Sequence, residues 1–112
     1  MHKINVKALS VNRAWQGKRF KTAEYKNYEQ LCLLSLPKIK IPDGNLQLIL
    51  IFGVSNMRMD FDNGIKPFVD ILQKKYGFND SRIVHAVITK YKVAKGCDYI
   101  EFSIRRSDLC DS

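Results

Sequence analysis

The feature that most constrains the fold is a change of hydrophobic period in the middle of the chain. The segment NLQLILIFGV (residues 45–54) is apolar along most of its length and follows the turn signal Pro-Asp-Gly. Such a run predicts a largely buried β-strand of about eight to ten residues. From Asn63 onward the apolar residues recur at helical spacing, and these residues are Ile65, Phe68, Val69, Leu72 and Tyr76. They predict a helix that ends at Gly77 and has Pro67 in its first turn.

Further elements are expected before this strand. Residues 4–11 contain enough alternating apolar side chains for a first strand. The segment NRAWQGKRFKT is expected to form a basic loop or short hairpin around Gly17. Thr22 is placed to cap a helix that runs to about Leu36, where Pro37 stops it.

The last two apolar segments, RIVHAVITKYKV and DYIEFSI, are expected to pair as a closing β-hairpin around Lys95 and Gly96. The resulting order, β-α-β-α-β-β, predicts an α+β fold with the helices packed on a small mixed sheet. With 112 residues, 46% of them hydrophobic, and no repeat or linker, the chain is expected to form a single domain over residues 1–112.

The positive charge is concentrated in the N-terminal part of the sequence. Residues 1–42 hold nine Lys and Arg against two acids, whereas residues 43–112 hold ten against nine. A localised positive field suits a polyanionic partner such as nucleic acid, although a basic solvated surface is the plainer alternative. The three cysteines form no CxxC pair and no zinc pattern, and no segment is apolar enough to span a membrane. We therefore expect a reduced, cytoplasmic protein with no membrane association.

The motif MRMDFDNGIKPFVD concentrates carboxylates in this basic chain. On an extended segment, Asp60 and Asp62 point to the same side, so that two like charges converge. Such convergence is unfavourable unless a shared proton or a divalent cation relieves it, and ligands that are all oxygen favour Mg²⁺ or Mn²⁺ over zinc. Asp80 could join them only if the strand that follows it pairs beside the strand that precedes the motif.

The spacing of the motif does not fit a calcium-binding loop, because Gly64 occupies the fifth position rather than the sixth and the twelfth residue is not Glu. A plainer alternative is that Asp60 and Asp62 are solvated and Asn63 caps the helix. Asp70 would then be an ion-pair partner four residues from Lys66 or Lys74.

The motifs RMDFDNGIKPFVDIL, GFNDSRI and the upstream SVNRAWQGKRFKTAEYKNY together resemble the RusA family of Holliday junction resolvases over about residues 10–104. The resemblance implies that Asp60, Asp62 and Asp80 bind the metal and that these three and Lys66 are catalytic. It places Asn63 and Asp70 at supporting positions. The chain departs from the family pattern in having Asn79 where members often carry a second acid, and only Arg58 where they often carry a run of arginines.

The resemblance implies a Mg²⁺-dependent endodeoxyribonuclease that resolves four-way DNA junctions in recombination and repair, often encoded by a phage or prophage. Because a junction needs two symmetric nicks and one chain carries one site, a homodimer is expected. The expected phosphate contacts are Arg13, Lys18, Arg19, Lys21 and Arg58. Tyr25 and Tyr28 either stack on bases or face the helix core. The alternatives are a non-catalytic nucleic-acid-binding protein and a metal nuclease that cuts forks, flaps or RNA.

Overall fold

A four-stranded mixed sheet organises the fold, in the order β1-β6-β4-β5. The computed structural model describes residues 1–9, 15–16, 20–58 and 64–108. β4 (Leu46–Val54) lies between β5 (Ile83–Lys92), which runs parallel to it, and β6 (Tyr99–Arg106), which runs antiparallel. β1 (His2–Ile4) pairs antiparallel with β6 at one side of the sheet.

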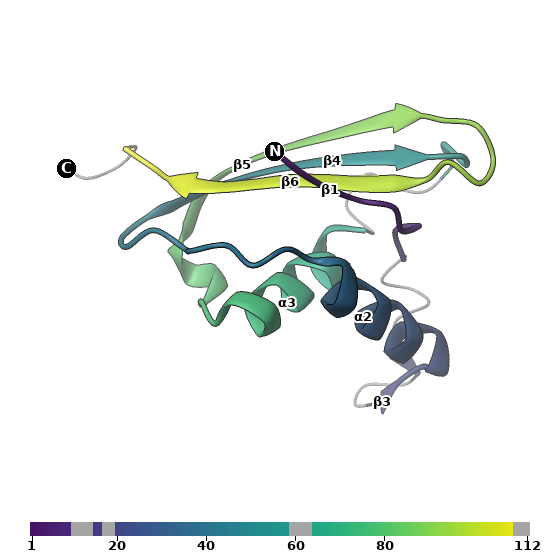
Figure 1. Cartoon of the computed structure of the whole chain (residues 1–112), viewed down its shortest axis with the longest axis horizontal. Helices are drawn as coiled ribbons and strands as arrows, with labels where there is room; N and C mark the ends of the chain where they lie inside the picture. Colours follow the sequence, from purple (N-terminus) through teal and green to yellow (C-terminus); the bar gives the residue numbers. More distant parts are fainter. Residues whose placement is uncertain (10–14, 17–19, 59–63, 109–112) are drawn as a thin grey trace.

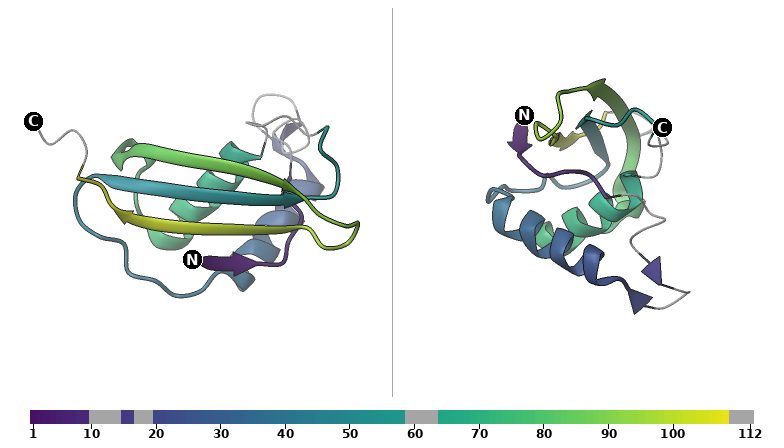
Figure 2. Two further views of the ribbon diagram at one scale, coloured as in Figure 1. Left: turned by 90° about the horizontal axis from the view of Figure 1, so that it is seen from above. Right: turned by 90° about the vertical axis from the view of Figure 1, so that its right-hand side faces the viewer.

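Two helices cover one face of this sheet, as Figures 1 and 2 show. α2 (Ala23–Ser35) begins after Thr22, whose side-chain oxygen accepts a hydrogen bond from the backbone N–H of Tyr25 at 3.1 Å, as the capping pattern predicts. α3 (Ile65–Tyr76) connects β4 to β5 and ends at Gly77, which has a left-handed φ of 71°. Both predicted helices are therefore confirmed, with ends close to the expected residues.

The core lies between the helices and the sheet. Leu46, Leu48 and Leu50 alternate along β4 with half-buried residues and are at most 2% exposed, which is the pattern of a strand with one packed face. The apolar stripe of α3 meets them, and the Phe68 ring lies 5.9 Å from that of Phe102 on β6 in an edge-on arrangement. The α+β class with a small mixed sheet is confirmed.

The predicted closing hairpin is wrong. β5 and β6 do not pair with each other in the described structure, because each pairs with β4 on opposite sides. β4 is the most apolar strand, and flanking it on both sides satisfies its backbone groups and buries its Leu side chains. The first strand lies earlier than expected: of the predicted residues 4–11 only Ile4 belongs to β1. Residues 5–9 are not in a strand, although Val6, Ala8 and Leu9 are buried, and residues 10 and 11 lie outside the described structure.

The basic segment before α2 forms a short hairpin, the second of the two forms expected for it. β2 (Trp15–Gln16) pairs antiparallel with β3 (Phe20–Lys21). None of the helices in the described ranges is long and apolar enough to cross a membrane.

Candidate functional site

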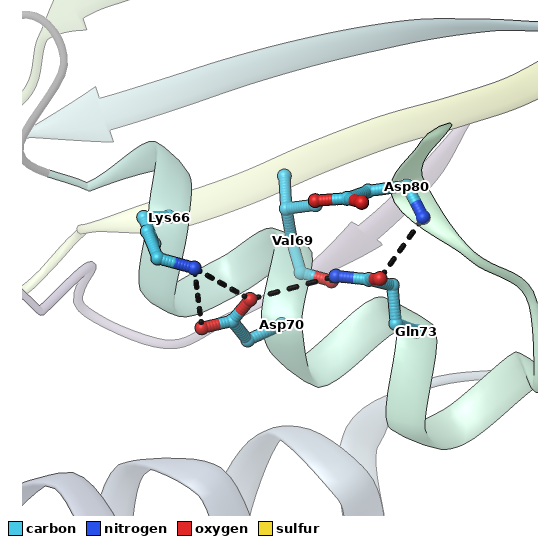
Figure 3. A network of polar contacts seen from close by, with 5 residues as sticks. All are labelled: Lys66, Val69, Asp70, Gln73 and Asp80. Atoms are coloured by element: carbon cyan, nitrogen blue, oxygen red, sulfur yellow. Dashed lines mark hydrogen bonds and ion pairs between the residues drawn. The ribbon is translucent and has the colours of Figure 1, made fainter. Parts of the chain in front are cut away.

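The parallel pairing of β4 and β5 meets the requirement set by the sequence. Residues 46–54 pair with residues 83–92 with one register shift between Leu46 and Gln47, so the strand that follows Asp80 lies beside the strand that precedes the acidic motif. The crossover between them is α3, which starts just after the motif. The chain then turns at Gly77 and brings Asp80 back alongside the helix (Figure 3).

A pocket of about 210 Å³ lies at this crossover. Its lining consists of two carboxylates, one ammonium group and two apolar side chains, from Ile65, Lys66, Val69, Asp70 and Asp80. The pocket therefore combines the first turns of α3 with the short 3-10 helix η1 (Asp80–Arg82) that precedes β5. It also lies where the described chain resumes after residues 59–63.

Lys66 and Asp70 form an ion pair across one turn of α3. The Lys66 Nζ lies 3.2 Å from Oδ1 and 3.3 Å from Oδ2 of Asp70. The Lys66 side chain is 65% exposed, and an exposed pair of this spacing stabilises a helix by only about 0.3–0.5 kcal/mol. The i,i+4 pairing expected for Asp70 is confirmed, and the small free energy means that Lys66 can exchange this partner for another anion.

Asp80 is held beside α3 by its backbone. Its N–H donates to Oε1 of Gln73 at 2.9 Å, and the amide nitrogen of Gln73 in turn donates to Oδ1 of Asp70 at 3.5 Å (Figure 3). Asn79 caps η1 by accepting a hydrogen bond from the N–H of Ser81 at 2.8 Å. These contacts position Asp80 through backbone groups and leave its carboxylate in the pocket lining.

The segment between β4 and the acidic motif is held by two lysines of β5. Lys90 Nζ donates to the Met57 carbonyl at 3.2 Å and Lys92 Nζ donates to the Ser55 carbonyl at 2.5 Å. Sequence reasoning missed both lysines. The sequence does show that the two lysines alternate along a strand otherwise rich in apolar residues. Only the parallel register of β4 and β5 shows which carbonyl groups the lysines bind.

Several predicted site residues fall outside the described structure. These are Asp60, Asp62, Asn63, Arg13, Lys18 and Arg19, and for Lys21 only the backbone in β3 is described. Arg58 is exposed, and its N–H donates to the side-chain oxygen of Asn56 at 3.0 Å. Within the described ranges no group of three or more His, Cys, Asp or Glu side chains could hold a metal ion. The pocket itself offers only carboxylate oxygens as anionic donors, which is the chemistry that a hard cation prefers.

The tyrosines of α2 belong to the core. Tyr25 is 1% exposed and Tyr28 is 7% exposed, which confirms their core alternative and excludes them as stacking platforms. Burial raises the pKa of the Tyr25 hydroxyl, and the carboxylates of Glu29 and Asp70 raise it further.

No protein-family model matches the chain, and no curated protein matches it.

Proposed function

We propose that the protein is a Mg²⁺-dependent endodeoxyribonuclease that resolves four-way DNA junctions, as the resemblance to the RusA family implies. The observation that supports this most is the pocket at the β4-α3-β5 crossover, where the side chains of Lys66 and Asp80 come together from separate elements. The same crossover starts directly after the segment that contains Asp60 and Asp62. A phosphodiester nuclease needs metal-binding carboxylates and a positively charged side chain close together. In this chain Lys66 and Asp70, at the end of the first acidic motif, line the same pocket as Asp80 of the second motif.

In this proposal Asp80 would hold Mg²⁺, or Mn²⁺, together with Asp60 and Asp62. The bound cation would lower the pKa of a water molecule and neutralise charge on the transferring phosphoryl group. Asn63 and Asp70 support the site. For Asp70 that role is to keep the Lys66 ammonium group at the pocket until a phosphate replaces the weak ion pair.

The basic N-terminal region would bind the DNA backbone. Arg13, Lys18, Arg19 and Lys21 come from or adjoin the β2-β3 hairpin, and Arg58 stands before the acidic motif. Contacts from Lys and Arg to phosphate provide affinity without sequence preference. The paired nicks that resolve a junction would be made by the two sites of a homodimer.

The first experiment is to incubate the protein with a four-way junction, a linear duplex, a replication fork and a structured RNA in Mg²⁺. The proposal expects paired cleavage of the four-way junction at least about a hundredfold faster than cleavage of the duplex. Equal cleavage of forks or RNA would instead indicate a metal nuclease of different specificity. Absence of cleavage on all four would contradict the proposal.

Substitution of the carboxylates tests the site itself. Asp62→Asn and Asp80→Asn should each lower cleavage at least about a hundredfold, since each removes an anionic ligand, while junction binding stays equal or becomes tighter. Asp43→Asn, in the exposed turn before β4, is the matched control and should cleave like the parent protein. A junction-binding protein whose carboxylates are only structural would show no cleavage in the parent and a loss of folding in the variants.

A further inference from the structure

Gln73 binds the turn that follows α3 at two points. Its backbone carbonyl accepts a hydrogen bond from the N–H of Gly77 at 2.8 Å, and its side-chain oxygen Oε1 accepts one from the N–H of Asp80 at 2.9 Å. The first bond closes the last turn of the helix, and any residue at position 73 could accept it. The second bond depends on the side chain, and it ties the backbone of Asp80 to the helix (Figure 3).

The nitrogen of the same side-chain amide faces two oxygen atoms. Nε2 of Gln73 lies 3.4 Å from the Val69 carbonyl oxygen and 3.5 Å from Oδ1 of Asp70. A carbonyl and a carboxylate accept hydrogen bonds, whereas the backbone N–H of Asp80 donates one. The side chain at position 73 must therefore accept a hydrogen bond at one end and donate at the other, and an amide group does both.

The length of the Gln73 side chain also matters. Asparagine is shorter by one carbon–carbon bond, about 1.5 Å, so its amide would lie beyond hydrogen-bond distance of the Asp80 N–H. Glutamate has the right length, but an ionised carboxylate only accepts and would stand against the carboxylate of Asp70. The contacts at position 73 thus match both the chemistry and the length of glutamine.

The chain on either side of Asp80 is fixed by other contacts. Phe78 is 7% exposed and belongs to the core, and Arg82 Nε donates to the Gly44 carbonyl at 3.0 Å. Asp80 itself is exposed, and its carboxylate lines the pocket. Loss of the bond to Gln73 should therefore release the backbone of Asp80 while the turn and the rest of the fold stay in place.

We propose that Gln73 is a positioning residue whose side-chain amide fixes Asp80 at the wall of the pocket, with the carboxylate placed to bind a hard divalent cation. The inference rests on the proposed function, which gives Asp80 the role of a metal ligand, and it adds the residue that places this ligand. Gln73 also contacts Asp70, the partner of Lys66, so one side chain touches both sides of the pocket. Removal of a group that orients a metal ligand commonly weakens metal binding about 10- to 100-fold.

Two variants remove the bond to Asp80 for different reasons. Gln73→Met keeps the length of the side chain and loses the acceptor, whereas Gln73→Asn keeps the amide and loses the reach. Gln30→Met, at an exposed position of α2, is the matched control. Amide hydrogen exchange of the full chain without metal, followed by NMR, should become about fivefold faster at Asp80 in both Gln73 variants. Exchange at Gly77 should not change in Gln73→Met, because its N–H binds the backbone carbonyl of residue 73.

Isothermal titration calorimetry with Mn²⁺ alone measures the consequence for the site. The dissociation constant for Mn²⁺ should rise at least about tenfold in both Gln73 variants and stay at the parent value in Gln30→Met. The Mg²⁺ concentration that gives half-maximal junction cleavage should rise by a similar factor, while junction affinity without metal stays the same. A residue that only stabilised the helix would lower the melting temperature and leave the dissociation constant for Mn²⁺ unchanged.

Three results would overturn the proposal: exchange at Asp80 that neither variant alters, Mn²⁺ affinity that stays at the parent value in both, or a loss of affinity in only one of the two. A parent chain that binds Mn²⁺ less tightly after either substitution but cuts no DNA would reject the nuclease and keep the role of Gln73. A parent chain that binds no Mn²⁺ would reject both.

Discussion

At Gly53 the sheet admits no side chain. A Cβ built there would lie 2.1 Å from the Tyr99 ring, so the ring can cover β4 only because residue 53 is glycine. Glycine inside a strand usually marks such a close approach. The cost of the glycine in backbone entropy is offset by the contact of the ring with the sheet.

Gly53→Ala should therefore destabilise the protein by about 1–3 kcal/mol, because the added methyl group displaces the Tyr99 ring. The measurement is the free energy of unfolding in urea. The matched control is the same substitution in a Tyr99→Ala background, where alanine should cost less because the ring is gone. An equal cost in both backgrounds would show that the ring is not the cause.

The pairing of Lys66 with Asp70 shows what short spacing can predict. Residues four apart on a helix are neighbours whatever the fold, so this pair could be expected once the helix was recognised. The hydrogen bond from the Asp80 N–H to the Gln73 side chain could not be predicted from the sequence, because it depends on how the chain turns after the helix ends.

On the scale of elements, the C-terminal end of α3 sets the direction of the chain that follows the helix. Gly77 has φ 71° and its N–H donates to the Gln73 carbonyl at 2.8 Å, which closes the last turn and redirects the chain towards Asp80. No atom lies within 4 Å of a Cβ built on Gly77, so a side chain there would be limited by backbone strain alone.

Gly77→Ala should cost about 1 kcal/mol of stability, since alanine is strained at positive φ. Gly77→Asn should cost less, because asparagine tolerates the left-handed region better. Thermal and urea unfolding of the two variants measure the difference. If alanine proved as stable as glycine, the redirection of the chain would not depend on this conformation.

Among the secondary-structure elements, the main wrong prediction was that β5 and β6 pair with each other, because they lie on either side of β4. Adjacent strands in sequence with a short connection usually pair, and the local signals around Lys95 and Gly96 suit a hairpin. The buried strand β4 needs a strand on each side to pair its backbone N–H and C=O groups, and it pairs with both β5 and β6. That competition is between distant segments and leaves no local trace in either strand.

For the whole molecule, the buried thiol and phenol groups of one cysteine and two tyrosines predict how the free energy of unfolding depends on pH. Burial raises the pKa of Cys32 from 9.0 to about 12 and raises the pKa values of Tyr28 and Tyr25 above 10.0. The folded state therefore keeps protons that the unfolded state releases. Stability should be complete below about pH 9 and fall as the pH rises further, by at most about 1.4 kcal/mol per pH unit for each group.

Urea unfolding between pH 8 and pH 11 measures this dependence. Tyr28→Phe removes one of the groups and should flatten the decline. A stability that is constant or rises up to pH 11 would contradict the assignment.

The sequence by itself determined the helices, the caps at Thr22 and Gly77, the central strand and the presence of an acidic motif in a basic chain. Each of these depends on residues within a few positions of one another, so periodicity and turn chemistry are sufficient to predict them. The sequence did not determine the N-cap of α3, which is Gly64 and not Asn63. Only the tertiary structure decided that β5 lies beside β4, that Asp80 and Lys66 line one pocket, and that one face of the sheet is left uncovered by the described residues. These features depend on which apolar surfaces from distant parts of the chain pack against one another. That packing minimises the free energy of the whole molecule rather than of any single segment.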